Sequence, residues 1–326
     1  MPEYLSSPTH SFTIPSIYDN TQLACRIYLP QQLLSRNDTS QWRVRGAIVA
    51  HPYASLGGCY DDPVVSYIGG ELLEAGYVVG TFNFRGAGGS NGRTSWTAKP
   101  ELADYVSFYG FMMLYLRCLK LQPEKDPEGI RLILGGYSYG SLIASHLPAS
   151  EAVADLIIDA IQGTPAHEIL VAAKTICALS IVEIPQSTHY PIPGASGPGQ
   201  EARELLQSCG TTISYLLVSP LLPPINLFLT LFLDLSLEVD TQASGQRRQI
   251  PCPKPKGQLC AHGTLAIYGD EDTFTSVSKL RKWSGELSSV PQSQFQSAEV
   301  KGAGHFWRED GVEQQARRAL RLWLRQ

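Results

Sequence analysis

Apolar runs of strand length alternate with longer segments of helical spacing over the first 150 residues of the chain. Short apolar runs bounded by polar or glycine turns predict buried strands, whereas apolar residues three and four apart predict helices. The expected order is two strands within 11–30 around the polar turn at 18–20, a strand over 45–50, a helix near 65–75, a strand over 77–84, a helix over 101–119 and a strand over 131–134. This alternation predicts an α/β fold, with a mostly parallel sheet covered by helices on both faces.

The alternation is interrupted between residues 151 and 262. This stretch mixes helical pieces with a proline- and glycine-rich loop near 187–200, and segment 242–257 shows neither spacing. Only one core strand is expected inside it, at about 215–218. The pattern then returns with a strand over 264–268, a strand near 297–301 and a helix from about 311. We therefore expect residues 1–326 to form one domain in which 151–262 carries an inserted lid.

One apolar stretch is long enough to suggest a membrane span. Residues 209–233 contain no charged side chain, and about 20 apolar residues of helix cross a bilayer. However, Pro220, Pro223 and Pro224 lie in its middle, where they would interrupt the helical hydrogen bonds. The sequence instead predicts a buried strand, a proline turn and an apolar helix from about Ile225, with no transmembrane span.

Composition and charge narrow the class of protein. With 43% hydrophobic and 17% charged residues the chain is expected to be globular, and a net charge of −4 gives no reason to expect a nucleic-acid partner. The seven cysteines form no C-x-x-C pair, so no metal site is expected.

The first residues lack a secretory signal pattern, which predicts a cytoplasmic protein. The glycines after Phe84 do not complete G-x-G-x-x-G, because position 91 is asparagine, so no cofactor is expected.

A candidate nucleophile lies between an apolar run and a helical segment. Residues 136–140 read Gly-Tyr-Ser-Tyr-Gly, directly after the expected strand over 131–134. A G-x-S-x-G pentapeptide is typical of a strained strand-to-helix turn, in which a larger residue at either glycine would clash. Ser138 is therefore the expected nucleophile.

A serine nucleophile needs a histidine base, which in turn needs a carboxylate to orient it. Asp270, Glu271 and Asp272 follow the expected strand over 264–268, and His305 follows the strand near 297–301. The order serine, acid, histidine, with each residue after a later strand, is the one found in folds that carry this turn. We take His305 as the base and Asp272 as the acid, with Asp270 as the alternative.

The oxyanion of an acyl-transfer intermediate needs two backbone N–H donors. Tyr139, the residue after the nucleophile, is expected to supply the first. The second is expected from the loop after the strand over 45–50, where either Tyr53 or Ala54 qualifies, because Pro52 has no N–H.

These motifs together resemble the α/β-hydrolase superfamily, and within it small serine hydrolases. The matching segments are HPYASLGG at 51–58, FNFRGAGGSNG at 82–92, GGYSYG at 135–140, YGDEDTF at 268–274 and GAGHFW at 302–307. The resemblance places the family's nucleophile on Ser138, its acid on Asp272 and its base on His305. It also implies that Arg85 lies in a structural loop that borders the site. Tyr53 departs from the second histidine that many such hydrolases have after the proline.

The leading hypothesis is a serine hydrolase that cleaves a carboxylic ester or thioester of an apolar small molecule, with this acyl compound as its only expected partner. Similar enzymes occur in polyketide-type secondary metabolism. The resemblance therefore also allows an acyltransferase or cyclase, in which the same triad passes the acyl group to an alcohol. A third hypothesis, from another class, is a ligand-binding protein that keeps the fold without turnover.

Overall fold

The computed structural model describes residues 4–35, 42–119, 129–158, 161–184, 206, 210–231, 235–241, 246–250 and 252–326. The elements run in the order β1 (His10–Pro15), β2 (Gln22–Tyr28), α1 (Gln31–Leu34), β3 (Arg45–Ala50), the short 3₁₀ helix η2 (Ala54–Leu56), α2 (Pro63–Glu74), β4 (Val78–Phe82), α3 (Lys99–Cys118), β5 (Ile130–Tyr137), α4 (Tyr139–Ala144), α5 (Ser150–Ile158), α6 (Pro165–Glu183), β6 (Thr211–Val218), α8 (Ile225–Leu229), β7 (Leu237–Thr241), β8 (Gln246–Ile250), α9 (Pro255–Ala261), β9 (Gly263–Gly269), α10 (Val277–Ser288), β10 (Phe295–Val300) and α11 (Val312–Leu324).

An eight-stranded sheet forms the centre of the molecule, in the order β1-β2-β4-β3-β5-β6-β9-β10. Strand β2 pairs antiparallel with both of its neighbours, whereas β4, β3, β5, β6, β9 and β10 pair in parallel. This confirms the predicted α/β fold with a mostly parallel sheet. Because parallel strands end at the same edge, the loops after β3, β5, β9 and β10 meet at one side of the sheet.

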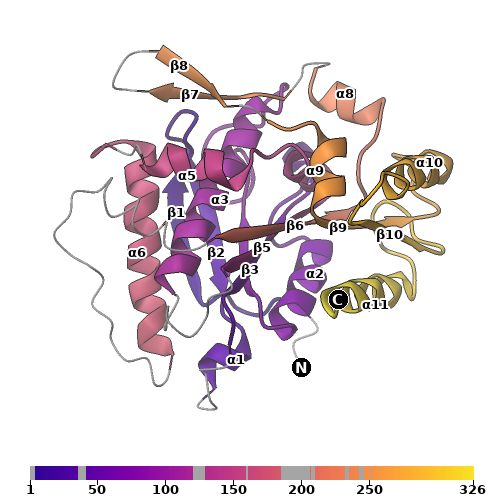
Figure 1. Ribbon diagram of the computed structural model, residues 1–326, viewed down its shortest axis with the longest axis horizontal. Helices are drawn as coiled ribbons and strands as arrows, with labels where there is room; N and C mark the ends of the chain where they lie inside the picture. Colours follow the sequence, from indigo (N-terminus) through magenta and orange to yellow (C-terminus); the bar gives the residue numbers. More distant parts are fainter. Residues whose placement is uncertain are drawn as a thin grey trace.

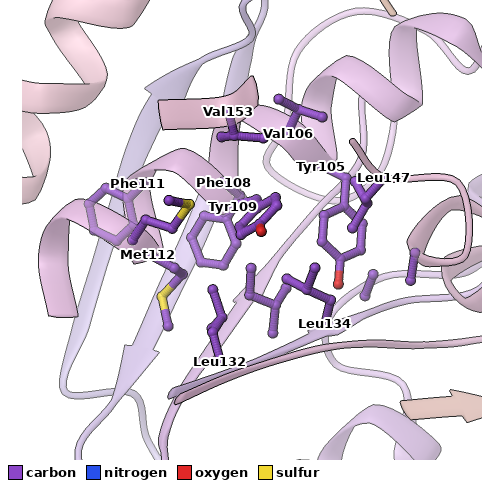
Figure 2. Close-up of a cluster of buried hydrophobic side chains, with 14 of the residues drawn as sticks. Tyr105, Val106, Phe108, Tyr109, Phe111, Met112, Leu132, Leu134, Leu147 and Val153 are labelled. Carbon is purple, nitrogen blue, oxygen red and sulfur yellow. The ribbon is translucent and has the colours of Figure 1, made fainter. Parts of the chain in front are cut away.

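Two separate hydrophobic cores cover the two faces of the sheet. Helices α2 and α11 pack together over one face, with buried residues such as Val65, Ile68 and Leu320. The other face is covered by α3, and α6 packs beside it against both α3 and the edge strand β1 (Figure 1). Helix α3 is mostly apolar around its whole circumference and almost wholly buried, as expected for a helix covered on several sides by other elements. Figure 2 shows its aromatic side chains over Leu132 and Leu134 of β5.

The apolar stretch at 209–233 is not one long helix. Over its described residues it forms β6, a turn through the three prolines and the five-residue helix α8. This agrees with the strand, turn and helix that were predicted from the positions of the prolines. A different helix, α6, has the length and mean hydropathy of a membrane-crossing segment. Its buried residues, including Ile169, Leu170 and Cys177, belong to the core cluster that contains α3.

The structure corrects the expectation for segment 242–257. Strand β8 pairs antiparallel with β7 in a separate two-stranded sheet, and α9 follows it. Strand β8 was not predicted because Ile250 is its only apolar residue, and its conformation comes from backbone pairing with β7. The predicted loop at 187–200 lies outside the described residues. The inserted lid within 151–262 stays a prediction. Of this segment, residues within 221–229 line the cavity that is described in the next subsection.

Candidate active site

Ser138 lies in a sharp turn between β5 and α4. Its φ and ψ are 55° and −111°, a conformation that side-chain-bearing residues seldom adopt. The turn is held by the N–H of Ser138, which donates to the carbonyl of Val218 at 2.8 Å. A Cβ on Gly136 would collide with the backbone of Gly140, and a Cβ on Gly140 would collide with the carbonyl of Ala50. The two glycines therefore let α4 approach β5 and β3 closely.

His305 lies within hydrogen-bond distance of the predicted nucleophile. Its Nε2 is 2.8 Å from Ser138 Oγ, and its Nδ1 is 2.7 Å from Asp272 Oδ2. An ionised carboxylate only accepts hydrogen bonds, so Nδ1–H donates to Asp272. Nε2 is then left as an acceptor for the Ser138 hydroxyl. All three side chains are buried.

Asp272, rather than the alternative Asp270, contacts the histidine. Asp272 Oδ1 accepts the N–H groups of Phe274 and Thr275 at 2.8 and 3.0 Å, which leaves Oδ2 directed at His305. Asp270 instead accepts the N–H of Gly302 at 2.6 Å. Asp270 thus ties the loop after β9 to the loop that carries His305.

Two backbone donors are available beside Ser138. Tyr139 is the first residue of α4, so its N–H has no partner within the helix. Tyr53 and Ala54 are the N-cap and first residue of η2, and their N–H groups are left unused by that helix for the same reason. The rings of Tyr53 and Tyr139 contact each other edge to face, with ring centroids 5.1 Å apart. The candidate oxyanion donors therefore come from two loops in mutual contact.

A cavity of about 260 Å³ contains Ser138 and His305 in its wall. Most of the wall is apolar, with Leu56, Leu221, Ile225, Leu229, Phe274 and Phe306. The charged side chains in the wall are Asp62 and Arg308. No group of three metal-ligating side chains was found among the described residues. The cavity can thus take a small, mostly apolar molecule within reach of the serine.

Comparison with known proteins shows the fold. No family model and no curated protein matches the chain. An α/β serine hydrolase homologue from Coxiella burnetii matches with 17% identity and a TM-score of 0.51, covering 97% of each chain. A serine hydrolase without a lid from Xanthomonas campestris matches with 16% identity and a TM-score of 0.51, covering 98% of this chain and 96% of the other. The chain has the α/β-hydrolase fold. Est1E from Butyrivibrio proteoclasticus, solved with ferulic acid bound, also matches, with 13% identity, a TM-score of 0.50 and coverage of 97% of this chain and 98% of the other.

Tyr137 has a role in this α/β-hydrolase fold that the sequence did not reveal. Its hydroxyl donates to the carbonyl of His305 at 2.7 Å. The ring of Phe274 lies against the imidazole, with centroids 4.2 Å apart. The histidine is therefore held at its backbone and its ring as well as at Nδ1. A tyrosine inside a G-x-S-x-G motif gives no signal of this contact, because its partner lies 168 residues away.

His51 connects two loops next to the site. Its Nε2 accepts the N–H of Phe84 at 2.9 Å, and its Nδ1–H donates to the carbonyl of Pro52 at 2.6 Å. Nε2 can accept only in the neutral imidazole, and burial lowers the pKa of His51 to about 4. The histidine of the 51–58 segment thus positions the loop that carries Tyr53.

Arg85, for which the family resemblance implied a structural loop, is buried in an ion-pair network. Its guanidinium donates to both carboxylate oxygens of Asp104 on α3, at 3.0 and 2.6 Å, and to Asp19 in the β1–β2 turn at 2.8 Å. The loop after β4 is thereby fixed to α3 and to the edge of the sheet.

Proposed function

We propose that the protein is a serine hydrolase that cleaves a carboxylic ester or thioester of a small, mostly apolar molecule. The observation that carries the proposal is the hydrogen-bonded chain from Ser138 through His305 to Asp272, with the serine in a strained turn at the wall of a cavity. Several solved structures with the same fold are described as serine hydrolases, which supports this choice.

The geometry supports the following sequence of steps. Ser138 Oγ attacks the acyl carbon while its proton moves to His305 Nε2. Asp272 stabilises the resulting imidazolium through Nδ1, and the N–H groups of Tyr139 and of Tyr53 or Ala54 bind the oxyanion. His305 then gives the proton to the leaving oxygen or sulfur. Water, activated by the same histidine, attacks the acyl-enzyme and releases the acid.

The cavity argues for a compact substrate. Its volume of about 260 Å³ lies below the roughly 300–1,000 Å³ of sites for drug-sized ligands. The apolar wall favours a carbon-rich acyl or alkyl group over a sugar. Est1E, which has the same fold, is described with a small molecule, ferulic acid, bound to it.

Hydrolysis of p-nitrophenyl butyrate tests the proposal. The native protein is expected to release p-nitrophenol with saturation kinetics, and both Ser138→Ala and His305→Ala are expected to lose at least three orders of magnitude in kcat. Ser141→Ala is the matched control, because this neighbouring hydroxyl donates to the Ser138 carbonyl and not to His305. Turnover that survives Ser138→Ala, or its absence in the folded native protein, would contradict the proposal.

Product analysis with a competing alcohol distinguishes hydrolysis from acyl transfer. If water resolves the acyl-enzyme, butyrate remains the main product when millimolar alcohol is added. A butyrate ester that forms in preference to butyrate would support the acyltransferase hypothesis instead.

A further inference from the structure

Arg308 is one of two charged side chains, with Asp62, in a mostly apolar cavity wall, and nothing in the proposed reaction employs it. It is exposed and lines the cavity together with Ser138 and His305. Within the part of the chain that the structure describes, no carboxylate forms an ion pair with it. Its guanidinium carbon instead lies 5.4 Å from the ring centre of Phe306. A guanidinium in such a cation–π contact can still offer the N–H donors at its edge to a ligand.

The contacts of Arg308 place it on the side of the cavity next to His305. Phe306, the ring that Arg308 lies over, is edge-on to the His305 imidazole, with centroids 5.6 Å apart. Tyr53 and Tyr139, the candidate oxyanion donors, lie on two other loops. Because His305 must deliver its proton to the leaving oxygen, the leaving alcohol lies on the histidine side. Arg308 lies on the same loop as His305 and over Phe306, whose ring contacts the imidazole, and we take this as the leaving-group side of the cavity.

The competing negative charge in the cavity wall is Asp62. Its Oδ1 accepts the N–H of Val64 and caps helix α2, which fixes the carboxylate at that helix terminus. Asp62 lies beyond ion-pair distance of Arg308, since no contact within 4.0 Å joins these two described residues. Arg308 is thus the group in the wall that can pair with an anion, and its fork of N–H donors matches a carboxylate.

We propose that Arg308 binds a carboxylate on the leaving alcohol, so that the preferred substrate is an ester of a hydroxy acid. The inference rests on the proposed hydrolase function and names the substrate class of the same site. It predicts that an anionic leaving group is favoured over a neutral one of the same shape.

A pair of matched esters tests this preference. The rates for 4-acetoxybenzoate and 4-acetoxybenzamide, each divided by its spontaneous hydrolysis rate, are compared in the native protein, Arg308→Gln and Arg318→Gln. We expect the native kcat/KM to favour the carboxylate, and Arg308→Gln to lower it for that ester on the order of tenfold, mostly through KM. The same substitution is expected to change the amide ester less than twofold. Arg318 on α11 is exposed and outside the cavity wall, so its variant controls for the change in net charge.

A binding measurement separates failure of this inference from failure of the proposed function. Calorimetry with 4-hydroxybenzoate and 4-hydroxybenzamide requires no turnover. Tighter binding of the carboxylate that disappears in Arg308→Gln supports the assignment even if neither ester is cleaved, an outcome that would contradict the hydrolase function alone. Equal binding of the two compounds, absence of binding, or a preference that survives Arg308→Gln overturns the inference.

Discussion

Two neighbouring aspartates after β9 have different roles although the sequence alone made both candidates. Asp272 contacts His305, whereas Asp270 accepts a backbone N–H. We expect Asp272→Asn to lower kcat for p-nitrophenyl butyrate by roughly three orders of magnitude or more, because a neutral amide neither fixes the tautomer nor stabilises the imidazolium. Asp270→Asn makes the same chemical change two residues away and should stay within about fivefold of native. Reversed effects in steady-state kinetics would show that the acid is misassigned.

The hydroxyl of Tyr137 holds His305 by donating a hydrogen bond to the backbone carbonyl of the histidine. Tyr137→Phe removes one buried hydroxyl, which should lower the free energy of unfolding by about 1 kcal/mol. We also expect kcat to fall severalfold with little change in KM, since the imidazole loses one restraint while the cavity keeps its shape. Urea unfolding and steady-state kinetics measure the two effects. An unchanged kcat would mean that the contact serves stability alone.

The turn from β5 into α4 places the nucleophile, and its geometry depends on close backbone approach. Gly140→Ala would force a Cβ against the carbonyls of Ala50 and His51. We expect it to lower the free energy of unfolding by about 1–3 kcal/mol and to reduce kcat, because α4 must shift away from β3.

Gly285 offers a matched control for that substitution. It is exposed in α10, where an added Cβ meets nothing within 4 Å. Gly285→Ala should therefore stabilise the protein by about 0.5–1 kcal/mol and leave kcat unchanged. Similar chemical-denaturation midpoints for the two variants would contradict the role given to the turn.

Elements with strong apolar patterns were predictable, and those held by backbone pairing were not. Strand β3 and helix α2 followed from apolar runs with clear ends, and the proline turn before α8 followed from the three prolines. Strand β8 has one apolar residue, so its sequence favours neither element. Its conformation comes from pairing with β7, which periodicity does not report.

At the scale of the whole molecule, the buried neutral His51 makes stability depend on pH. The pKa of His51 is about 4 in the folded protein and near 6.5 when unfolded. Between these values the unfolded chain binds one more proton, so the free energy of unfolding falls as pH decreases from about 6.5 to 4, by about 3 kcal/mol in all. Urea unfolding at pH 7, 6 and 5 should show this slope, and His51→Gln should flatten it. Equal slopes in the two proteins would contradict the assignment of a neutral histidine.

The three residues of the candidate triad were more predictable from the sequence than the contacts that hold them in place. Ser138, Asp272 and His305 each follow a strand and carry their own local signal, and parallel strands bring such positions to one edge of the sheet. The contacts that hold them are long-range, such as Tyr137 to His305 and His51 to Phe84. Arg308 gave no signal either, because its place in the cavity wall depends on how several segments far apart in the sequence fold together.

The central claim is that Ser138 is activated by His305, and active-site labelling tests it most directly. The native protein is treated with a fluorophosphonate probe, and the modified residue is located by mass spectrometry. We predict stoichiometric labelling of Ser138 in the native protein and in Ser141→Ala, and none in Ser138→Ala or His305→Ala. Labelling of a different serine, or none in the folded native protein, would contradict the account.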